Sequence, residues 1–371
     1  MKPLTATTKR GYRTDGDGSG HYGPAIVVAL ALLVAAGAGC APESGAIAVD
    51  ADAEVAELLA TADARLASRT PAGLTASLEL YQQAGRLDPS AARAHAGAAN
   101  AGCLLALYSL RPPAEVLPPA EAAAQEALRL APDLAESWAA LGLVDYLYHW
   151  DFERAEERFL EASRLDPELA VVHHWRGMLL TATSRHHESV AAFDAALTLA
   201  PDSVLYRTKR ATVLARTGDR EAARRELEAV LAAHPDSALA WRELGFLDLA
   251  ENRPGAAVAA LERAAELAGG ASKSQGGLGY AWAVTGRADA AREVLAAFHE
   301  RARREWVPPI YVAMMQGGLG EVDAAFASLR RAVEARDPGV VYLAVRPGFE
   351  PLRGDPRFDD LLAEIGLSER G

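Results

Sequence analysis

The sequence predicts an all-α solenoid of stacked helical hairpins, and three observations support this fold class. Prolines recur at Pro167, Pro201 and Pro235, each 34 residues after the one before. Small and large apolar residues follow the same order in each of these segments. The chain has 371 residues, 50% of them apolar and 6% aromatic, and it has few alternating β-branched runs. A period of this length is typical of hairpins that bury their apolar faces by stacking.

The first 39 residues predict a signal peptide. A polar, basic leader precedes the charge-free run from Ala25 to Ala38, which is too short to span a bilayer comfortably. The residues Gly37-Ala38-Gly39 before Cys40 resemble the lipobox of bacterial lipoproteins, which implies lipidation of Cys40. We therefore expect an anchored protein of the bacterial cell envelope that faces the periplasm or exterior. An uncleaved signal anchor and ordinary secretion are the alternatives. Residues 40–51 predict a tether.

Small residues mark where the two helices of each hairpin should cross. Gly142, Gly177 and Gly245 lie on the first helices, and a larger side chain at these positions would overpack the crossing. Large residues such as Phe159 fill the wider gaps. Each proline should end its helix, because it lacks an N–H and disfavours a helical residue before it.

This pattern resembles the tetratricopeptide repeat over residues 52–338. The resemblance implies a right-handed superhelical solenoid of about eight helical hairpins, closed by a C-terminal cap over residues 339–371. Asp355 and Pro356 are suited to start a capping helix. In the second unit, the segment from Arg111 to Pro119 predicts a lengthened turn.

Two stretches are more specific than the general repeat. The segments His149–Phe152 and His173–Trp175, with the ending Leu352–Phe358, resemble arrays attached to bacterial adenylate cyclases, winged-helix regulators and some protein kinases. This resemblance implies an alternative function as the sensory or regulatory array of a signalling system.

The composition excludes several classes of function. The net charge of -12 opposes binding to phosphate backbones, so we expect no nucleic-acid partner. The chain contains no nucleophile elbow, zinc-protease motif or phosphate-binding loop, so an enzyme and a cofactor are not expected. Cys103 lies within an apolar helical run and is interpreted as a small buried residue.

Five of the nine histidines fall in two adjoining units: His149, His173, His174, His186 and His187. A metal-binding repeat protein is therefore a further alternative. The spacing disfavours it, because these histidines form no pair four residues apart on a helix, and no metal site is assigned.

The resemblance implies that first helices line a concave surface that binds a partner. Counting from the crossing positions, the candidate partner-binding residues are Leu143, Tyr146, His174, Met178, Thr208, Thr212, Arg242, Phe246 and Tyr280. The set is mainly aromatic and apolar, which is typical of peptide or protein recognition. The sequence thus favours a non-enzymatic, membrane-anchored scaffold that binds a protein or peptide on its concave face; its oligomeric state is left open.

Overall fold

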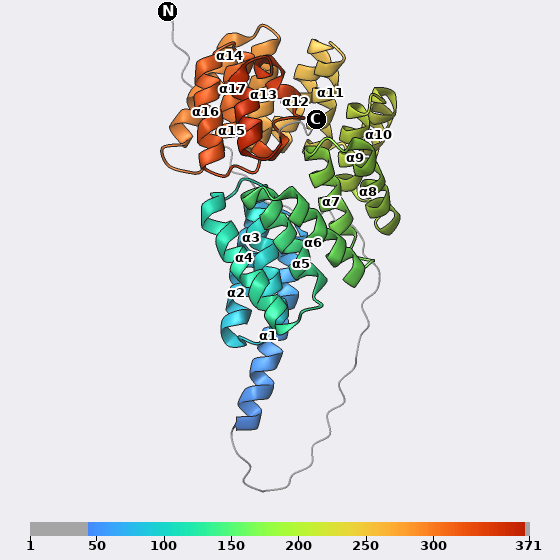
Figure 1. Cartoon of the computed structure of the whole chain (residues 1–371), viewed down its shortest axis with the longest axis vertical. Coiled ribbons are helices and arrows are strands. Elements are labelled where there is room, and N and C mark those ends of the chain that lie inside the picture. Colours follow the sequence, from blue (N-terminus) through green and yellow to red (C-terminus); the bar gives the residue numbers. More distant parts are fainter. Residues whose placement is uncertain (1–43, 368–371) are drawn as a thin grey trace, which may run out of the picture. The chain divides into compact units, whose positions relative to one another are not determined.

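The computed structural model describes the backbone of residues 44–367 and the side chains of residues 52–367. The chain divides into two units, residues 1–45 and 46–371, and the second holds nearly all described residues. Within the described range the secondary structure is helical and contains no strand. Figure 1 shows the helices following one another as antiparallel pairs from α1 to α16, with α17 after the last pair. The predicted all-α fold class is confirmed.

The helices have short connections. The first half contains α1 (Ser44–Ala67), α2 (Pro71–Leu87), α3 (Ala92–Leu107), α4 (Pro113–Leu130), α5 (Ala135–Val144), the π-helix η1 (Asp145–His149), α6 (Phe152–Leu165), α7 (Ala170–Ala182) and α8 (His186–Leu199). The second half contains α9 (Val204–Arg216), α10 (Arg220–Ala233), α11 (Ala238–Ala250), α12 (Pro254–Leu267), α13 (Ser272–Val284), α14 (Ala288–Arg301), α15 (Pro309–Gly318), α16 (Val322–Glu334), the 3-10 helices η2 (Val340–Tyr342) and η3 (Pro347–Leu352), and α17 (Pro356–Glu364).

Eight hairpins, from α1–α2 to α15–α16, make up the array, as the repeat pattern predicts. The second helices α6, α8 and α10 each end two residues before Pro167, Pro201 or Pro235. Helix α1 already begins at Ser44, inside the segment 40–51 that the sequence predicts as a tether. The predicted signal peptide and Cys40 lie outside the described residues.

The crossing glycines allow the predicted close approach within hairpins. A Cβ on Gly142 would lie 2.6 Å from Cε1 of Phe159, and one on Gly245 would lie 2.6 Å from Cγ of Leu261. The same relation holds for Gly177, which faces a phenylalanine of α8 at 2.9 Å. Glycine on the first helix and a large side chain on the second are therefore one packing unit.

The backbone conformation of the turn inside each hairpin repeats more regularly than the residue type found there. A residue with positive φ recurs every 34 residues, at Trp150, Ser184, Gly218, Asn252, Gly286 and Gly320. Three of the six are not glycine, so the sequence alone shows this period only in part. The unit that contains Trp150 runs 35 residues from Pro132 to Pro167, one more than the next two, and η1 winds this extra residue into a π-turn.

One local prediction needs correction. The segment Arg111–Pro119 is mostly helical, because α4 begins at Pro113 and contains Pro118 and Pro119. The turn before α4 spans residues 108–112, against 183–185 between α7 and α8, so it is lengthened only slightly. The helices α9 and α11 are capped by the hydroxyls of Ser203 and Ser237. Asp202 and Asp236, which precede these serines, are not the N-cap residues.

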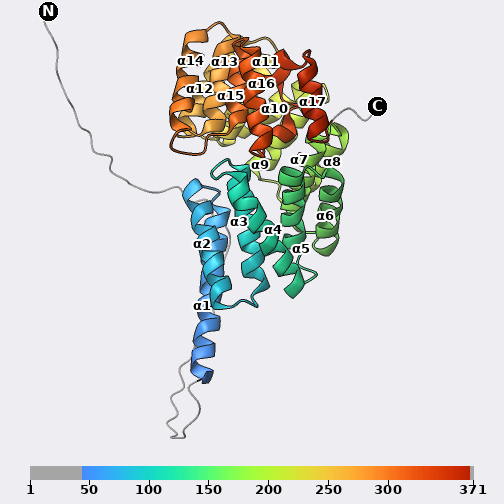
Figure 2. The same cartoon turned by 60° about the vertical axis from the view of Figure 1, so that its left-hand side comes forward.

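The capping helix at the C-terminal end is confirmed. The carboxylate of Asp355 accepts the N–H of Arg357 at 3.0 Å, and Pro356 occupies the first turn of α17. Phe358 and Leu361 are buried where α17 packs on α16. Figure 2 shows α17 beside α16 at the end of the array.

Candidate binding surface on the inner helices

The first helices of neighbouring hairpins contact one another along two stretches of the array. Contacts link α3 to α5, α9 to α11, α11 to α13 and α13 to α15. Second helices pack instead on the first helix of their own hairpin and on the next one, as α8 does on α7 and α9. We call the following side chains of the first-helix layer the inner face: Tyr146, His174, Tyr206, Lys209, Thr212, Arg216, Arg242, Glu243, Phe246, Lys273 and Tyr280.

A C-terminal segment lies on this inner face. We call residues Asp337–Arg353, which include η2 and η3, the strap. The guanidinium of Arg216 on α9 donates to the carbonyl of Val345. The hydroxyl of Tyr280 on α13 donates to the carbonyl of Pro347 at 3.3 Å. The strap is therefore tied to two inner helices, an arrangement that the sequence does not indicate.

The residue before the strap is held by an aromatic stack. The guanidinium carbon of Arg336 lies 3.8 Å from the centre of the Trp150 ring and 5.8 Å from that of Tyr148. Arg336 and Trp150 both adopt positive φ, at 55° and 59°. A cation over an aromatic face is attracted by the ring quadrupole. This stack fixes the start of the strap against the end of η1.

The structure buries most of the nine predicted partner-binding residues. Thr212 and Phe246 are partly exposed, whereas the other seven are buried: Leu143, Tyr146, His174, Met178, Thr208, Arg242 and Tyr280. The Tyr146 hydroxyl donates to the carbonyl of Met178 at 3.3 Å, and its ring meets Tyr342 of the strap edge-on at 6.4 Å. Leu143 belongs to the hydrophobic core. Partner binding by this set stays a prediction.

Aromatic pairs stand on neighbouring inner helices. The His174 ring stacks on Tyr206 with centroids 5.0 Å apart, and Phe246 stacks on Tyr280 at 6.4 Å. Burial, with the nearby Lys209 acting in the same direction, lowers the pKa of His174 to about 3. His174 is thus a neutral member of an aromatic surface at ordinary pH.

A charged cluster lies on the same inner helices, and of its members the sequence predicted only Arg242. Glu243 Oε1 pairs with Lys209 Nζ at 3.5 Å and with a guanidinium nitrogen of Arg242 at 2.8 Å. Lys273 on α13 has no ion pair within the described residues. Arg346 of the strap also lacks one there and lies over the rings of Tyr311 and Tyr342, at 5.8 Å from each.

The pKa shifts show how unevenly this cluster is charged. Burial and repulsion from Arg242 and Lys209 hold the pKa of Lys273 well below its usual range. Burial alone would raise the pKa of Glu243, but the attraction of Lys209 and Arg242 overcomes it and lowers the pKa well below the ordinary value. Burial lowers the pKa of Arg216 to about 10. Basic side chains outnumber carboxylates in this cluster, and burial disfavours the charged form of Lys273 in particular.

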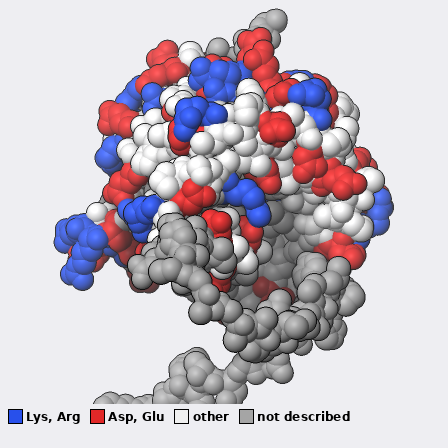
Figure 3. All heavy atoms as spheres, turned by 90° about the horizontal axis from the view of Figure 1, so that it is seen from below, with Lys and Arg blue, Asp and Glu red and all other residues white. Residues whose placement is uncertain are grey.

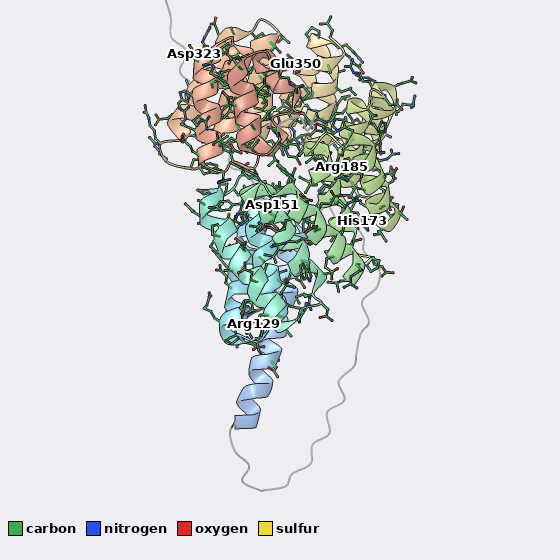
Figure 4. The ribbon with its side chains drawn as sticks, viewed as in Figure 1. Arg129, Asp151, His173, Arg185, Asp323 and Glu350 are labelled. Carbon is green, nitrogen blue, oxygen red and sulfur yellow. The ribbon has the colours of Figure 1, made fainter. Side chains whose placement is uncertain are left out.

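The histidines are not gathered into a metal centre. Figure 4 shows His173 and Arg185 apart on the α7–α8 hairpin, and His186 follows Arg185 at the start of α8. His149 pairs instead with Glu121, with 3.0 Å between Nε2 and Oε2. Among residues 44–367 no group of three or more His, Cys, Asp or Glu side chains is placed to hold a metal ion.

A pocket lies in the amino-terminal hairpins. It has a volume of about 530 Å³ and opens between α2, α3 and α4, and its lining includes Tyr81, His95 and Arg111. Tyr81 is held by its hydroxyl, which donates to Asp63 at 2.5 Å. The pocket is broad and mixed in polarity, and it gathers no cluster of reactive groups.

The outer surface carries both signs of charge. On the described part of the face in Figure 3, basic and acidic side chains are interspersed and form no large patch of one sign. Surface pairs such as Arg303 with Glu300, at 2.6 Å, contribute to this mixture. Within residues 44–367, no helix has both the length and the apolar character needed to cross a bilayer. The buried thiol of Cys103 faces the carbonyl of Ala140, as predicted for a small core residue.

Comparisons with known proteins agree with the hairpin architecture. Family models of the tetratricopeptide repeat match residues 144–204 and 206–247. A comparison with curated proteins found no match. These two spans include α7, α9 and most of α11, which carry much of the inner face.

Solved structures show the same fold over longer spans at low identity. The Cut9–Hcn1 hetero-tetramer of the APC/C superposes with a TM-score of 0.55 at 15% identity, covering 83% of this chain and 55% of that chain. Yeast Tom70 gives 0.48 at 13% identity, covering 81% and 61%. Pseudomonas aeruginosa PilF gives 0.44 at 19% identity, covering 61% and 97%. The chain contains tetratricopeptide repeats, and its eight hairpins form a solenoid of that fold.

Proposed function

We propose that this chain is a non-enzymatic scaffold that binds a protein or peptide partner on its inner face and is held at a bacterial membrane through a lipid on Cys40. The proposal depends mainly on the side chains that make up the inner face. Stacked hairpins of this fold present a continuous surface of side chains from successive first helices. Here that surface combines two aromatic pairs with a charged cluster.

The inner face has the chemistry of a recognition surface. Aromatic rings supply large contact areas at low conformational cost, and charged groups between them supply specificity. Thr212 and Phe246 provide partly exposed contact points. The mixed charges of the outer surface and the net charge of -12 give no support to a nucleic-acid partner.

A photo-crosslinking side chain tests which face binds the partner. We would place it in the full chain at Thr212, on the inner face, and in a matched variant at Leu160, an outer residue that is 49% exposed. In bacterial cells the Thr212 position should yield a discrete adduct with another protein, and the Leu160 position should not. Adducts of equal yield from both positions, or from Leu160 alone, would reject the inner face as the binding surface.

The membrane anchor has its own test. The lipobox resemblance predicts that the wild-type chain takes up labelled fatty acid and sediments with membranes. Cys40→Ala should abolish both, whereas Cys103→Ala, at a buried position, should abolish neither. A Cys40→Ala protein that still sediments with membranes would reject the lipid anchor. If the Thr212 position gave the cross-linked adduct but the wild-type chain took up no fatty acid, the scaffold function would be supported and only the membrane attachment would be rejected.

A further inference from the structure

The pocket of the amino-terminal hairpins has an apolar floor along one side of α3, which lies beside both α2 and α4 (Figure 2). The floor residues recur every three or four positions, as on one face of a helix: Ala94, Ala98, Gly102 and Leu105. Apolar residues of α2 and α4 form the walls: Leu78, Val116, Pro119, Ala120 and Ala123. At a rise of 1.5 Å per residue, the floor is about 16 Å long. We call this pocket the outer groove.

Larger side chains fill the matching space in later hairpins. At the position of Ala98, nine residues after the preceding proline, α7 has Arg176 and α9 has Arg210, and α5 and α11 have leucine. Arg210 pairs with Asp194 of α8 at 2.6 Å and with Glu226 of α10 at 2.8 Å. It therefore bridges the two second helices that flank α9. Alanine on α3 makes no such bridge and leaves the outer groove open and apolar.

The charged side chains of the outer groove are separated along its length. A Cβ on Gly85 would lie 3.8 Å from that of Ala94, so the neighbouring Arg86 stands where α3 begins. Because α2 runs antiparallel to α3, Glu79 lies about 10 Å closer to the end where α3 finishes. Glu79 and Arg86 are exposed and make no ion pair within residues 52–367, so both charges are available to a ligand.

A second carboxylate lies at the end of the groove where α3 finishes. Glu115 is in the first turn of α4 and pairs with Arg111 at 2.8 Å, which leaves Glu79 as the net charge there. A helix carries partial positive charge at its amino terminus and partial negative charge at its carboxyl terminus. A helix lying antiparallel to α3 would place its positive end beside Glu79 and its negative end beside Arg86. The opposite direction would make both contacts repulsive.

We propose that the outer groove binds an amphipathic helix of a partner protein, antiparallel to α3, with its amino-terminal end beside Glu79 and its carboxyl-terminal end beside Arg86. The small floor residues let the two helices approach closely, and the groove accommodates about three turns of the bound helix. Apolar residues spaced as i, i+4 and i+7 on the partner would rest on Ala98 and Gly102. None of the lining residues belongs to the inner face, so this surface is additional to the inner-face site.

Two helical peptides with bridged side chains test the direction of binding. Both carry the same leucine face over three turns. The first peptide has lysines in its first turn and glutamates in its last turn, and the second has these charges exchanged. In fluorescence anisotropy with the full chain, the first peptide should bind about fivefold or more tightly than the second. Equal binding of the two peptides would overturn the proposal.

Ala98→Leu tests the place of binding, because it introduces the residue type that α5 and α11 carry at this position. The added side chain occupies the floor, so the affinity for the first peptide should fall about tenfold or more. The matched control Ala122→Leu makes the same change at an exposed position of α4 and should leave the affinity unchanged. Equal affinities of the two variants would contradict binding in the outer groove.

A charge exchange adds a test that does not depend on packing. Glu79→Lys changes an exposed residue and should reverse the preference, so that the second peptide binds more tightly than the first. An unchanged preference would overturn the proposal. The midpoint of urea unfolding of Ala98→Leu should match or exceed that of the wild type, because leucine fills open apolar space. If this midpoint falls, the Glu79→Lys result alone decides.

Self-association and inner-face binding give different results from these. If the wild-type chain sediments as a dimer and Ala98→Leu as a monomer, a second copy occupies the groove and the proposal is overturned. The Thr212 adduct in cells should persist in Ala98→Leu, because the groove and the inner face share no residue. Absence of that adduct from the wild-type chain would reject inner-face binding, whereas the two peptides decide the outer groove.

Discussion

The hairpin turns offer a clean test of backbone strain, and Gly218→Ala is the informative substitution. Gly218 has φ of 96°, in the region that L side chains rarely adopt. A Cβ placed there would meet no heavy atom within 4 Å, so crowding contributes nothing. Any loss of stability must therefore come from the backbone conformation itself.

The expected magnitude follows from two opposing effects. A left-handed conformation costs a residue with a Cβ about 1–2 kcal/mol. Replacing glycine by alanine restricts the unfolded chain and returns about 0.4–1 kcal/mol. Gly218→Ala should thus lower the free energy of unfolding by about 1 kcal/mol.

Gly255 supplies the matched control. It is exposed, has no heavy atom within 4 Å of a built Cβ, and lies within α12 at a helical φ. Gly255→Ala should raise the free energy of unfolding by about 0.5–1 kcal/mol. Ser184 occupies the same turn position as Gly218 with φ of 61°, so Ser184→Gly should be neutral or slightly stabilising.

Urea titrations followed by far-UV circular dichroism would measure all three variants against the wild type. The midpoints should rank Gly255→Ala highest and Gly218→Ala lowest. If Gly218→Ala were as stable as Gly255→Ala, the positive φ would not be the reason for glycine at this turn.

Four further predictions concern buried groups. Gly142→Ala should cost about 1–3 kcal/mol because its Cβ would lie 2.6 Å from Phe159, and adding Phe159→Leu should recover part of the loss in urea titrations. Burial raises the pKa of Asp337 to about 6, so wild-type stability should fall by about 3 kcal/mol relative to Asp337→Asn as pH rises from about 4 to about 7; parallel curves would contradict this. Asp145→Asn should cost about 3 kcal/mol in chemical unfolding, because this fully buried carboxylate pairs with two arginines at 2.6 Å and 2.9 Å. Burial raises the pKa of Cys103 to about 12, so a thiol reagent should modify it only at the rate of unfolding, and rapid labelling of the folded Cys40→Ala chain would refute its burial.

The sequence predicts the hairpins well because their causes are local. A proline two residues after a helix, or a glycine opposite a large side chain 16 or 17 residues later, leaves its mark within one repeat. Gly142 and Gly245 can therefore be assigned to the crossings from the sequence alone. The π-turn at η1 is harder to predict from the sequence, because the extra residue appears only as a repeat of unusual length.

The strap and the charged cluster could not be predicted in the same way. Tyr342 meets Tyr146 across almost 200 residues of chain, and a contact of that range leaves no periodic signal. Lys209 and Glu243 lie two residues before a crossing position, whereas the inner face was counted mainly after it. Lys273 stands six residues before Gly279 and so falls outside the same count. In the preceding turn the count took only the third residue before each crossing position, as at His174, Thr208 and Arg242; the second and sixth residues before it would have added all three.

The strap also changes how the array should unfold. In an open solenoid each repeat touches only its neighbours, so the ends fray independently and unfolding spreads along one dimension. Here Val345 is bonded to Arg216, and Tyr342 packs on Tyr146, so the last segment supports hairpins near the middle of the chain. Loss of the terminal hairpin would expose the central ones at once. The strap therefore links the stability of distant repeats into one cooperative transition, which forms only after long loops have closed.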